Sequence, residues 1–365
     1  MTRPASDLRP RIGVDLTRAG ADTAWPALVR EAAALAPELA LQAFVAPAQR
    51  RLLDTGAAGP AVPAVVVPPG LPAAWRWPRL QRQWRLDLLH LDGVAPWWAG
   101  GAWSTSLHQL PQGRSLRRVA GARFIGVPSR WAGERLVHDH GVDPARVAVV
   151  PPGVDAVRFR PGSDGRALVH ALGLEPNGYL CCVARRDARK LPLTLLEALA
   201  HMPRPRPTLV LIGREEDPAH RLALEIAVQR LGLAADVRLL DHITDTQLPA
   251  LLRHARLFVQ PSLEAHRGTA VLEAMASGVA VVTADVPVLA ERVGRAGLTV
   301  HPHDSHELAA AMLCLLADPR RREALVQRGL ARAQAHHWRG VAERLVEGWR
   351  DAVARPAPLR SPAWA

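Results

Sequence analysis

Residues 179–302 alternate between short apolar runs and longer segments whose apolar residues have helical spacing. Uninterrupted short apolar runs are typical of strands buried on both faces, and the helices between them provide crossovers between parallel strands. This alternation predicts a doubly wound parallel sheet. We expect strands at 179–184, 208–213, 237–241, 257–260, 279–285 and 297–302, and helices at 191–202, 221–231, 246–254, 269–277, 305–317 and 320–336.

The first half of the chain has the same organisation in a less regular form. We expect strands at 11–16, 39–47, 63–69, 86–91, 103–110, 123–129 and 147–150, and helices at 25–39 and 130–138, with Ser129 as the N-cap of the second. A Pro/Gly-rich exit from the last of these strands is the best domain boundary.

A chain of 365 residues is long enough for two separate cores. The fold class is therefore α/β, with two Rossmann-like, doubly wound parallel-sheet domains. We predict an N-terminal domain at 1–155, a C-terminal domain at 156–336, a helix at 337–353 that packs back toward the first domain, and a tail at 354–365.

Composition excludes several classes of protein. No uninterrupted apolar run reaches the ~18 residues needed to span a bilayer, and the N-terminus lacks the apolar segment of a signal peptide. The three cysteines, Cys181, Cys182 and Cys314, are too few for a disulfide framework or a metal site. We expect a cytoplasmic protein with buried thiols and no bound metal.

The formal net charge of +12 raises the question of a nucleic-acid partner. No RNP, zinc-finger or helix-turn-helix pattern accompanies it, so we expect none. An arginine-rich surface suits phosphorylated substrates or anionic lipids instead. Lys190 is the single lysine among 46 basic residues, which favours a role that needs a compact charge on a flexible stem.

The segment Trp75–Arg85 interleaves three tryptophans with four arginines. Trp at headgroup depth and Arg paired with phosphate suit an anionic membrane surface, so this segment is a candidate contact with the inner face of the plasma membrane. The alternative is an ordinary domain surface with arginines extended over apolar neighbours. Pro78 is expected to prevent one continuous helix from Trp75.

Charged residues follow two of the predicted strands, at the edge where ligands of parallel α/β sheets bind. Arg185 and Lys190 lie in the loop after strand 179–184, where they can present two cations to a diphosphate. His108 lies at the end of the strand expected at 103–110. A single histidine is more often structural than functional, and both interpretations stay open here.

The stretch 258–278 runs from a strand through a polar loop into a helix opened by Gly268. Free N–H groups and the positive dipole end at such a helix start suit an anion. Glu273, expected in the first turn, can accept hydrogen bonds from ribose hydroxyls or simply complement the dipole. The chain has neither G-x-G-x-x-G after a strand nor a P-loop motif, which excludes the usual dinucleotide and P-loop sites.

The second half of the chain resembles the donor domain of the GT-B glycosyltransferases of family 4 type. The resemblance implies a GT-B fold in which the two domains face a central cleft, a nucleotide-sugar donor, retention of anomeric configuration, and neither metal nor cofactor. It is strong after Arg123 and rests on VARRDARK (183–190), LVLIG (209–213), VRLLDHITDTQL (237–248), PSLEAHRGTAVLEAMASGVAVVTADVPVLAERVGRAGL (261–298) and VPSRWAGERLVHDHGVDPARVAVVPPGVDAVRFRP (127–161).

The resemblance also implies roles for individual residues. Arg185 and Lys190 would bind the donor diphosphate and stabilise the leaving group, because two cations beside developing negative charge can replace a metal. His108 would be the third catalytic residue, near the donor sugar. The other implied donor contacts are Ile243 with the base, Glu273 with the ribose, and His266, Arg267, Gly268 and Thr269 with the sugar.

The chain departs from the family pattern at the first glutamate of its E-x7-E motif. Counting back eight positions from Glu273 reaches Ala265, and Glu264 lies one position early. The usual Gly-Phe-Gly of this loop reads His266-Arg267-Gly268, so His266 or Arg267 is expected to take over the sugar contact, for example with an acidic or phosphorylated sugar. The choice of sugar therefore does not carry over from the family.

The function predicted from these features is a glycosyltransferase of the EC 2.4 class. It would move a sugar from a UDP- or GDP-sugar to a glycan or glycolipid acceptor, in cell-surface polysaccharide or lipopolysaccharide synthesis at the cytoplasmic membrane face. One alternative is a catalytically impaired GT-B protein that binds nucleotide sugars or has a regulatory function. Another is a nucleotide-sugar 2-epimerase, although its catalytic acids are not apparent at matching positions.

Overall fold

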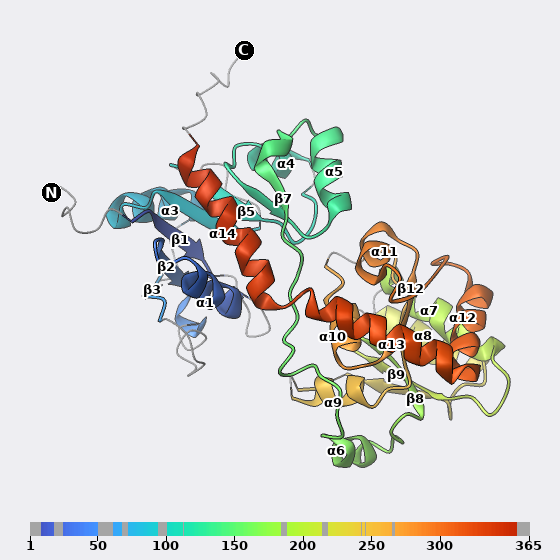
Figure 1. The fold of residues 1–365 in the computed structure, drawn as a ribbon. Coiled ribbons are helices and arrows are strands. Elements are labelled where there is room, and N and C mark those ends of the chain that lie inside the picture. Colours follow the sequence, from blue (N-terminus) through green and yellow to red (C-terminus); the bar gives the residue numbers. More distant parts are fainter. Residues whose placement is uncertain are drawn as a thin grey trace. The chain divides into compact units, whose positions relative to one another are not determined.

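The computed structural model describes residues 9–17, 25–49, 61–67, 72–93, 101–111, 113–183, 188–213, 218–241, 243–244, 246–264 and 267–355. The chain divides into two compact units, one formed by Met1–Gly153 with Trp338–Ala365 and the other by Val154–His337. Each unit is built on a parallel sheet covered by helices (Figure 1), which confirms the predicted fold class.

Within the described residues, the first unit has a seven-stranded sheet in the order β3-β2-β1-β4-β5-β6-β7. The order changes direction between β1 and β4, which makes the carboxyl ends of these two strands a topological switch point, the usual ligand position in such sheets. The strands are β1 (Arg11–Asp15), β2 (Ala40–Val45), β3 (Ala64–Val66), β4 (Leu88–Asp92), β5 (Trp103–Ser106), β6 (Ile125–Val127) and β7 (Val147–Val149).

Different helices cover the two faces of this sheet, because side chains alternate between the faces along each strand. Leu88 lies in the core shared with α1 (Trp25–Leu35) and α14 (Trp338–Ala354). Leu89 points to the opposite face and packs with Trp77 of α3. The helices on this second face are α3 (Ala73–Trp84), α4 (Arg114–Val119) and α5 (Arg130–His138), and short 3-10 turns lie at η1 (Pro47–Gln49) and η2 (Pro144–Arg146).

The prediction that Pro78 interrupts the helix was wrong. α3 runs continuously from Ala73 to Trp84 with Pro78 as its sixth residue. The proline removes one helical hydrogen bond in the middle of the helix. Tertiary contacts maintain the helix, since Trp77 is only 2% exposed and Gln81 binds the backbone of residues 101–102 through both ends of its amide.

Within the described residues, the second unit has a six-stranded sheet in the order β10-β9-β8-β11-β12-β13. Its switch point lies between β8 and β11. The strands are β8 (Tyr179–Val183), β9 (Thr208–Ile212), β10 (Val237–Leu240), β11 (Leu257–Gln260), β12 (Ala280–Ala284) and β13 (Gly297–Val300). The helices are α6 (Arg166–Ala171), α7 (Pro192–His201), α8 (Pro218–Arg230), α9 (Gln247–Arg253), α10 (Thr269–Ala276), α11 (Pro287–Val293), α12 (Ser305–Ala317) and α13 (Pro319–Gln334), with the 3-10 turn η3 (Ala188–Lys190).

Both faces of the second sheet are buried, which explains its uninterrupted apolar strands. Cys181 and Cys182 are consecutive on β8 and belong to the cores on opposite faces. Both are free thiols, and burial raises the pKa of Cys182 to about 12, so this thiol is uncharged. Cys314 is only half-buried, which corrects the expectation that all three are buried.

Candidate functional site

The candidate donor site of the second unit lies at the carboxyl ends of β8 and β11. These neighbouring strands flank the switch point of their sheet. Lys190 ends η3, which follows β8, and Ser262 follows β11. The fold therefore places the single lysine of the chain at the sheet edge where phosphorylated ligands bind in such folds.

The loops after these two strands are joined through Glu264. Its backbone oxygen accepts hydrogen bonds from Lys190 Nζ at 2.5 Å and from Ser262 Oγ at 2.8 Å. Its carboxylate pairs with Arg189 Nη1 at 2.9 Å, and the amide of Leu263 donates to the backbone oxygen of Arg189 at 2.9 Å. Glu264 therefore anchors the lysine loop, and its carboxylate is engaged by Arg189.

The backbone after Lys190 has an uncommon conformation. Leu191 has φ of 51° and precedes Pro192, the first residue of α7. The left-handed region costs a non-glycine residue on the order of 1–2 kcal/mol, and such strain is concentrated at functional sites. The strained turn ends the lysine loop beside the switch point.

Gly268 is favoured by its backbone conformation and has little room for a side chain. It has φ of 67° at the start of α10, and an added Cβ would lie 3.3 Å from Cγ of Arg292. Thr269 begins the helix, so Glu273 is its fifth residue. The expectation of Glu273 in the first turn is therefore wrong, and the dipole explanation for its acidity loses force because that effect decays within the first turn.

Arg292 is a buried cation that sequence reasoning missed. It is 2% exposed, and its Nη1 lies 3.1 Å from Nε2 of His336. Burial lowers the pKa of Arg292 to about 10, and the charges of Arg332 and Arg267 act in the same direction. The available signal was helical spacing, because position 292 falls on the buried face of α11. A buried arginine therefore lies directly beside Gly268.

Two further predicted donor residues lie on other segments of the second unit. Ile243 follows β10 and is half-buried against the core of the second unit. Arg267 leads into Gly268 and is half-buried. The calls for Arg185 and His266, and the departure at Ala265, lie outside the described residues.

The candidate site of the first unit contains His108, Asp92 and Asp15. β5 ends at Ser106, so His108 lies two residues beyond the strand rather than within it. His108 Nε2 lies beside Asp92 Oδ1. Asp15 ends β1, and its Oδ1 accepts hydrogen bonds from the amide and hydroxyl of Thr17 at 2.9 and 2.7 Å. Asp15 and Asp92 were missed, although an aspartate at the carboxyl end of a buried strand signals this edge.

His90 is a second histidine of this unit, and it belongs to the core. Its ring nitrogens lie 2.9 Å from Ser104 Oγ and 3.1 Å from Ser106 Oγ. The rings of Trp25 and Trp349 pack against it, each with a centroid distance of 5.4 Å. Burial lowers the pKa of His90 to about 3, so this imidazole is neutral in the folded protein.

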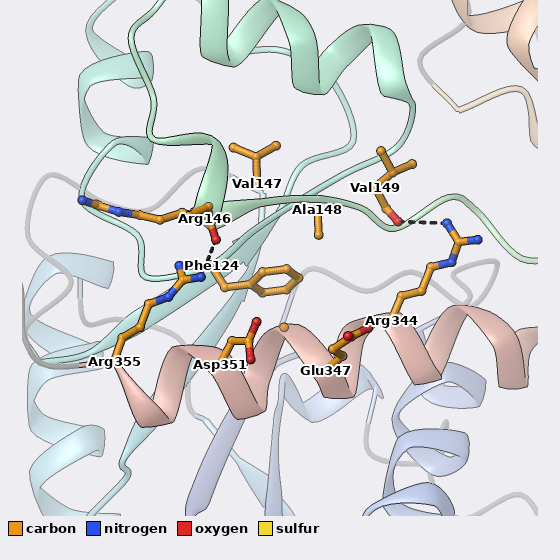
Figure 2. Close-up of a pocket in the computed structure, with 11 residues that line it drawn as sticks. Phe124, Arg146, Val147, Ala148, Val149, Arg344, Glu347, Asp351 and Arg355 are labelled. Carbon is orange, nitrogen blue, oxygen red and sulfur yellow. Dashed lines mark hydrogen bonds between the residues drawn. The ribbon is translucent and has the colours of Figure 1, made fainter.

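A pocket of about 280 Å³ lies elsewhere in the first unit, between β7 and α14 (Figure 2). Arg344 donates to the backbone oxygen of Val149 at 3.3 Å, and Arg355 donates to that of Ala145. β7 is an edge strand. Arg344 covers a carbonyl of this strand, and Arg355 covers a carbonyl of the preceding turn η2, a common way to protect an edge. None of the predicted site residues lines this pocket.

Across the part of the chain that the structure describes, no group of three or more His, Cys, Asp or Glu side chains is arranged to hold a metal ion.

Comparison with known proteins identifies the family. One family model, described as glycosyl transferases group 1, matches residues 171–332, and a second, described as Glycosyltransferase Family 4, matches residues 40–158. D-inositol 3-phosphate glycosyltransferase 2 of Catenulispora acidiphila is 33% identical over 298 residues, which cover 70% of this chain and 68% of that protein. D-inositol 3-phosphate glycosyltransferase of Streptomyces bingchenggensis is also 33% identical, over 77% of this chain and 62% of its own length.

Solved structures agree on the fold. Anabaena HepE in complex with UDP and glucose matches with a TM-score of 0.75 at 19% identity, covering 94% of this chain and 100% of that one. Sucrose-phosphate synthase from Thermosynechococcus elongatus has a TM-score of 0.73 at 22% identity, covering 95% and 100%. The two parallel-sheet units therefore define a GT-B fold. The chain belongs to the family 4, group 1 glycosyltransferases.

Proposed function

We propose that this glycosyltransferase moves a sugar from a UDP-sugar to a hydroxyl acceptor with retention and without a metal. The observation that carries the proposal is the anchoring of Lys190 at the switch point between β8 and β11. An ammonium at this edge stabilises the diphosphate as its bond to the sugar breaks. Arg185 is proposed as the second cation, Glu273 as the ribose contact, and Ile243 as the base contact.

The donor and acceptor are proposed from relatives. The HepE structure holds UDP and glucose, which supports UDP as the nucleotide. The curated relatives are named for D-inositol 3-phosphate, which supports a phosphorylated polyol as the acceptor to test first. A glycan or glycolipid is the second acceptor class, and the outer surface of α3 supports it, as described below.

The direct test measures nucleotide release and nucleotide binding with a panel of UDP- and GDP-sugars. D-inositol 3-phosphate and lipid-linked glycans are supplied separately as acceptors. We expect UDP release that depends on one UDP-sugar and on one acceptor, and an α-linked product from an α-linked donor. Nucleotide binding without release in any combination would favour the impaired, nucleotide-binding alternative over an enzyme.

The outer surface of α3 supports a lipid-borne acceptor. Trp75 is 74% exposed, and Arg79 and Arg82 are exposed on the same side of the helix at helical spacing. The helix contains no acidic residue. A basic face with an exposed tryptophan complements anionic headgroups. Within the described residues no helix is long and apolar enough to cross a bilayer, so the proposed contact is with the membrane surface.

Binding to vesicles rich in phosphatidylglycerol is expected to fall as salt is raised, because the attraction is electrostatic. Arg79→Glu should weaken vesicle binding about fivefold or more, since each arginine near such a surface contributes about 1 kcal/mol. Vesicle sedimentation measures the effect. The matched control is Arg320→Glu, the same charge change at an exposed position of α13. Equal losses for the two variants would show attraction by net charge alone and remove α3 from the proposal.

A further inference from the structure

Helices α10, α11 and α13 of the second unit pack together on one face of its sheet (Figure 1). Arg292 is on the buried face of α11, together with Val288, Leu289 and Val293. A buried charge costs stability, and replacing a buried polar or ionic pair by apolar residues of similar volume is often neutral or stabilising. Packing alone therefore does not account for an arginine at this position.

The guanidinium of Arg292 is held by an imidazole whose tautomer is fixed by its surroundings. His336 Nδ1 lies 2.9 Å from the backbone oxygen of Arg332, and a carbonyl only accepts, so the ring hydrogen lies on Nδ1. Nε2 then has the lone pair and accepts a hydrogen bond from Nη1 of Arg292 at 3.1 Å. The imidazole in this arrangement is neutral, and the pKa of Arg292, lowered by burial to about 10, still leaves the guanidinium charged at neutral pH.

Arg292 also packs against the start of α10. A Cβ on Gly268, the N-cap of this helix, would lie 3.3 Å from Cγ and 3.6 Å from Nε of Arg292. Glu264, whose backbone oxygen binds Lys190, comes four residues before Gly268, so these two residues are at most about 14 Å apart. The buried positive charge is therefore close to the edge of the sheet at which Lys190 lies.

We propose that Arg292 supports the donor site by its charge: held in place by neutral His336, the buried guanidinium strengthens binding of the donor diphosphate. This inference rests on the proposed function, in which Lys190 binds that diphosphate. Arg292 is only 2% exposed, so it acts through its electrostatic field and not by contact. Opposite charges roughly 10 Å apart near a protein surface attract strongly enough to change a dissociation constant about tenfold.

The central variant replaces both members of the pair, Arg292→Met with His336→Leu, so that neither side chain leaves a polar group unpaired. We expect the dissociation constant of UDP to rise about 5- to 20-fold, at low and at high salt alike, because a buried charge is screened little. Binding of uridine, which has no phosphate, should not change. The urea midpoint of unfolding should stay the same or rise, whereas loss of a purely structural arginine would lower stability and the binding of both ligands together.

Titration calorimetry measures UDP binding, and ligand-observed NMR measures the weaker binding of uridine. Arg292→Gln is the single-residue version of the test, since its amide can still donate to Nε2 of His336, and it should weaken UDP binding to the same extent. Arg206→Met is the matched control. Arg206 is 11% exposed and donates to the backbone oxygens of Met202 and Ala200, but it precedes β9 and so lies at the opposite, amino end of the sheet. Removing this charge should leave the dissociation constant of UDP unchanged.

Equal UDP dissociation constants in the wild type and the Arg292 variants would overturn the role of Arg292 and leave the proposed function intact. Equal weakening of UDP binding in Arg206→Met, or weaker uridine binding in the Arg292 variants, would also overturn it. If the wild type binds neither UDP nor inorganic pyrophosphate, this edge of the sheet is not a diphosphate site, and the inference and the proposed function fail together.

Discussion

Lys190→Ala is expected to lower kcat by about 10²- to 10³-fold, the loss seen when one group that stabilises transition-state charge is removed. The ammonium stabilises negative charge that develops on the diphosphate only as the sugar leaves, so the loss should fall mainly on kcat. UDP binding should weaken less, because it measures the ground state. Steady-state kinetics with saturating acceptor gives kcat, and calorimetric titration gives the dissociation constant of UDP.

Two further variants separate charge from loop structure. Lys190 Nζ also binds the backbone oxygen of Glu264, so its removal loosens the loop. Ser262→Ala deletes the other side-chain hydrogen bond to that oxygen and leaves every charge in place. If Ser262→Ala lowers kcat as much as Lys190→Ala does, the effect of Lys190→Ala comes from loop anchoring and not from charge. Lys190→Arg should restore little activity, since the planar guanidinium differs from a compact ammonium in shape and reach.

The second large effect concerns acid stability and originates at His90. Its pKa falls from the ordinary 6.5 to about 3 in the folded protein because the ring is buried. Between pH 6.5 and about pH 3, the unfolded chain therefore binds a proton on His90 that the folded chain does not bind. The contribution of His90 to the free energy of unfolding is fully present above pH 6.5 and is lost as the pH falls toward 3. The loss is about 2 kcal/mol between pH 7 and pH 5 and about 5 kcal/mol in all.

Urea unfolding of the wild type and of His90→Gln at a series of pH values measures this effect. All eleven tryptophans lie within the first unit, so their fluorescence reports on the unit that contains His90. His90→Gln should be less stable at neutral pH and should lose less stability on acidification. His140→Gln, at an exposed position, is the control for the other histidines. Parallel pH profiles for the wild type and His90→Gln would disprove the assignment.

The sequence predicted local features well where one segment carries its own signal. α5 spans Arg130–His138 as expected, with Ser129 accepting the amide of Ala132 at 3.2 Å as its N-cap. The cap and the apolar spacing lie within one short stretch and need no distant partner. α3 was misread because Pro78 is a local signal that the burial of Trp77 overrides.

The candidate site was only partly predictable. His108 was identified from its nearness to a strand end, but its neighbour Asp92 lies sixteen positions earlier on another strand. Arg292 was missed because a charged residue in an amphipathic helix is ordinarily a surface residue. Glu264 was read as a displaced motif residue, and the structure shows it bound to Arg189 and Lys190.

The sequence by itself determined the class of fold, because strands buried on both faces require uninterrupted apolar runs, and helices between them require apolar residues at helical spacing. The family followed from the resemblance of motifs such as those at 127–161 and 261–298. Only the tertiary structure decided which side chains meet. The contact of Lys190 with Glu264 spans 74 positions and exists because β8 and β11 are neighbours in the sheet. Strand order and register are set by the packing of the whole unit, so no single stretch of residues specifies them.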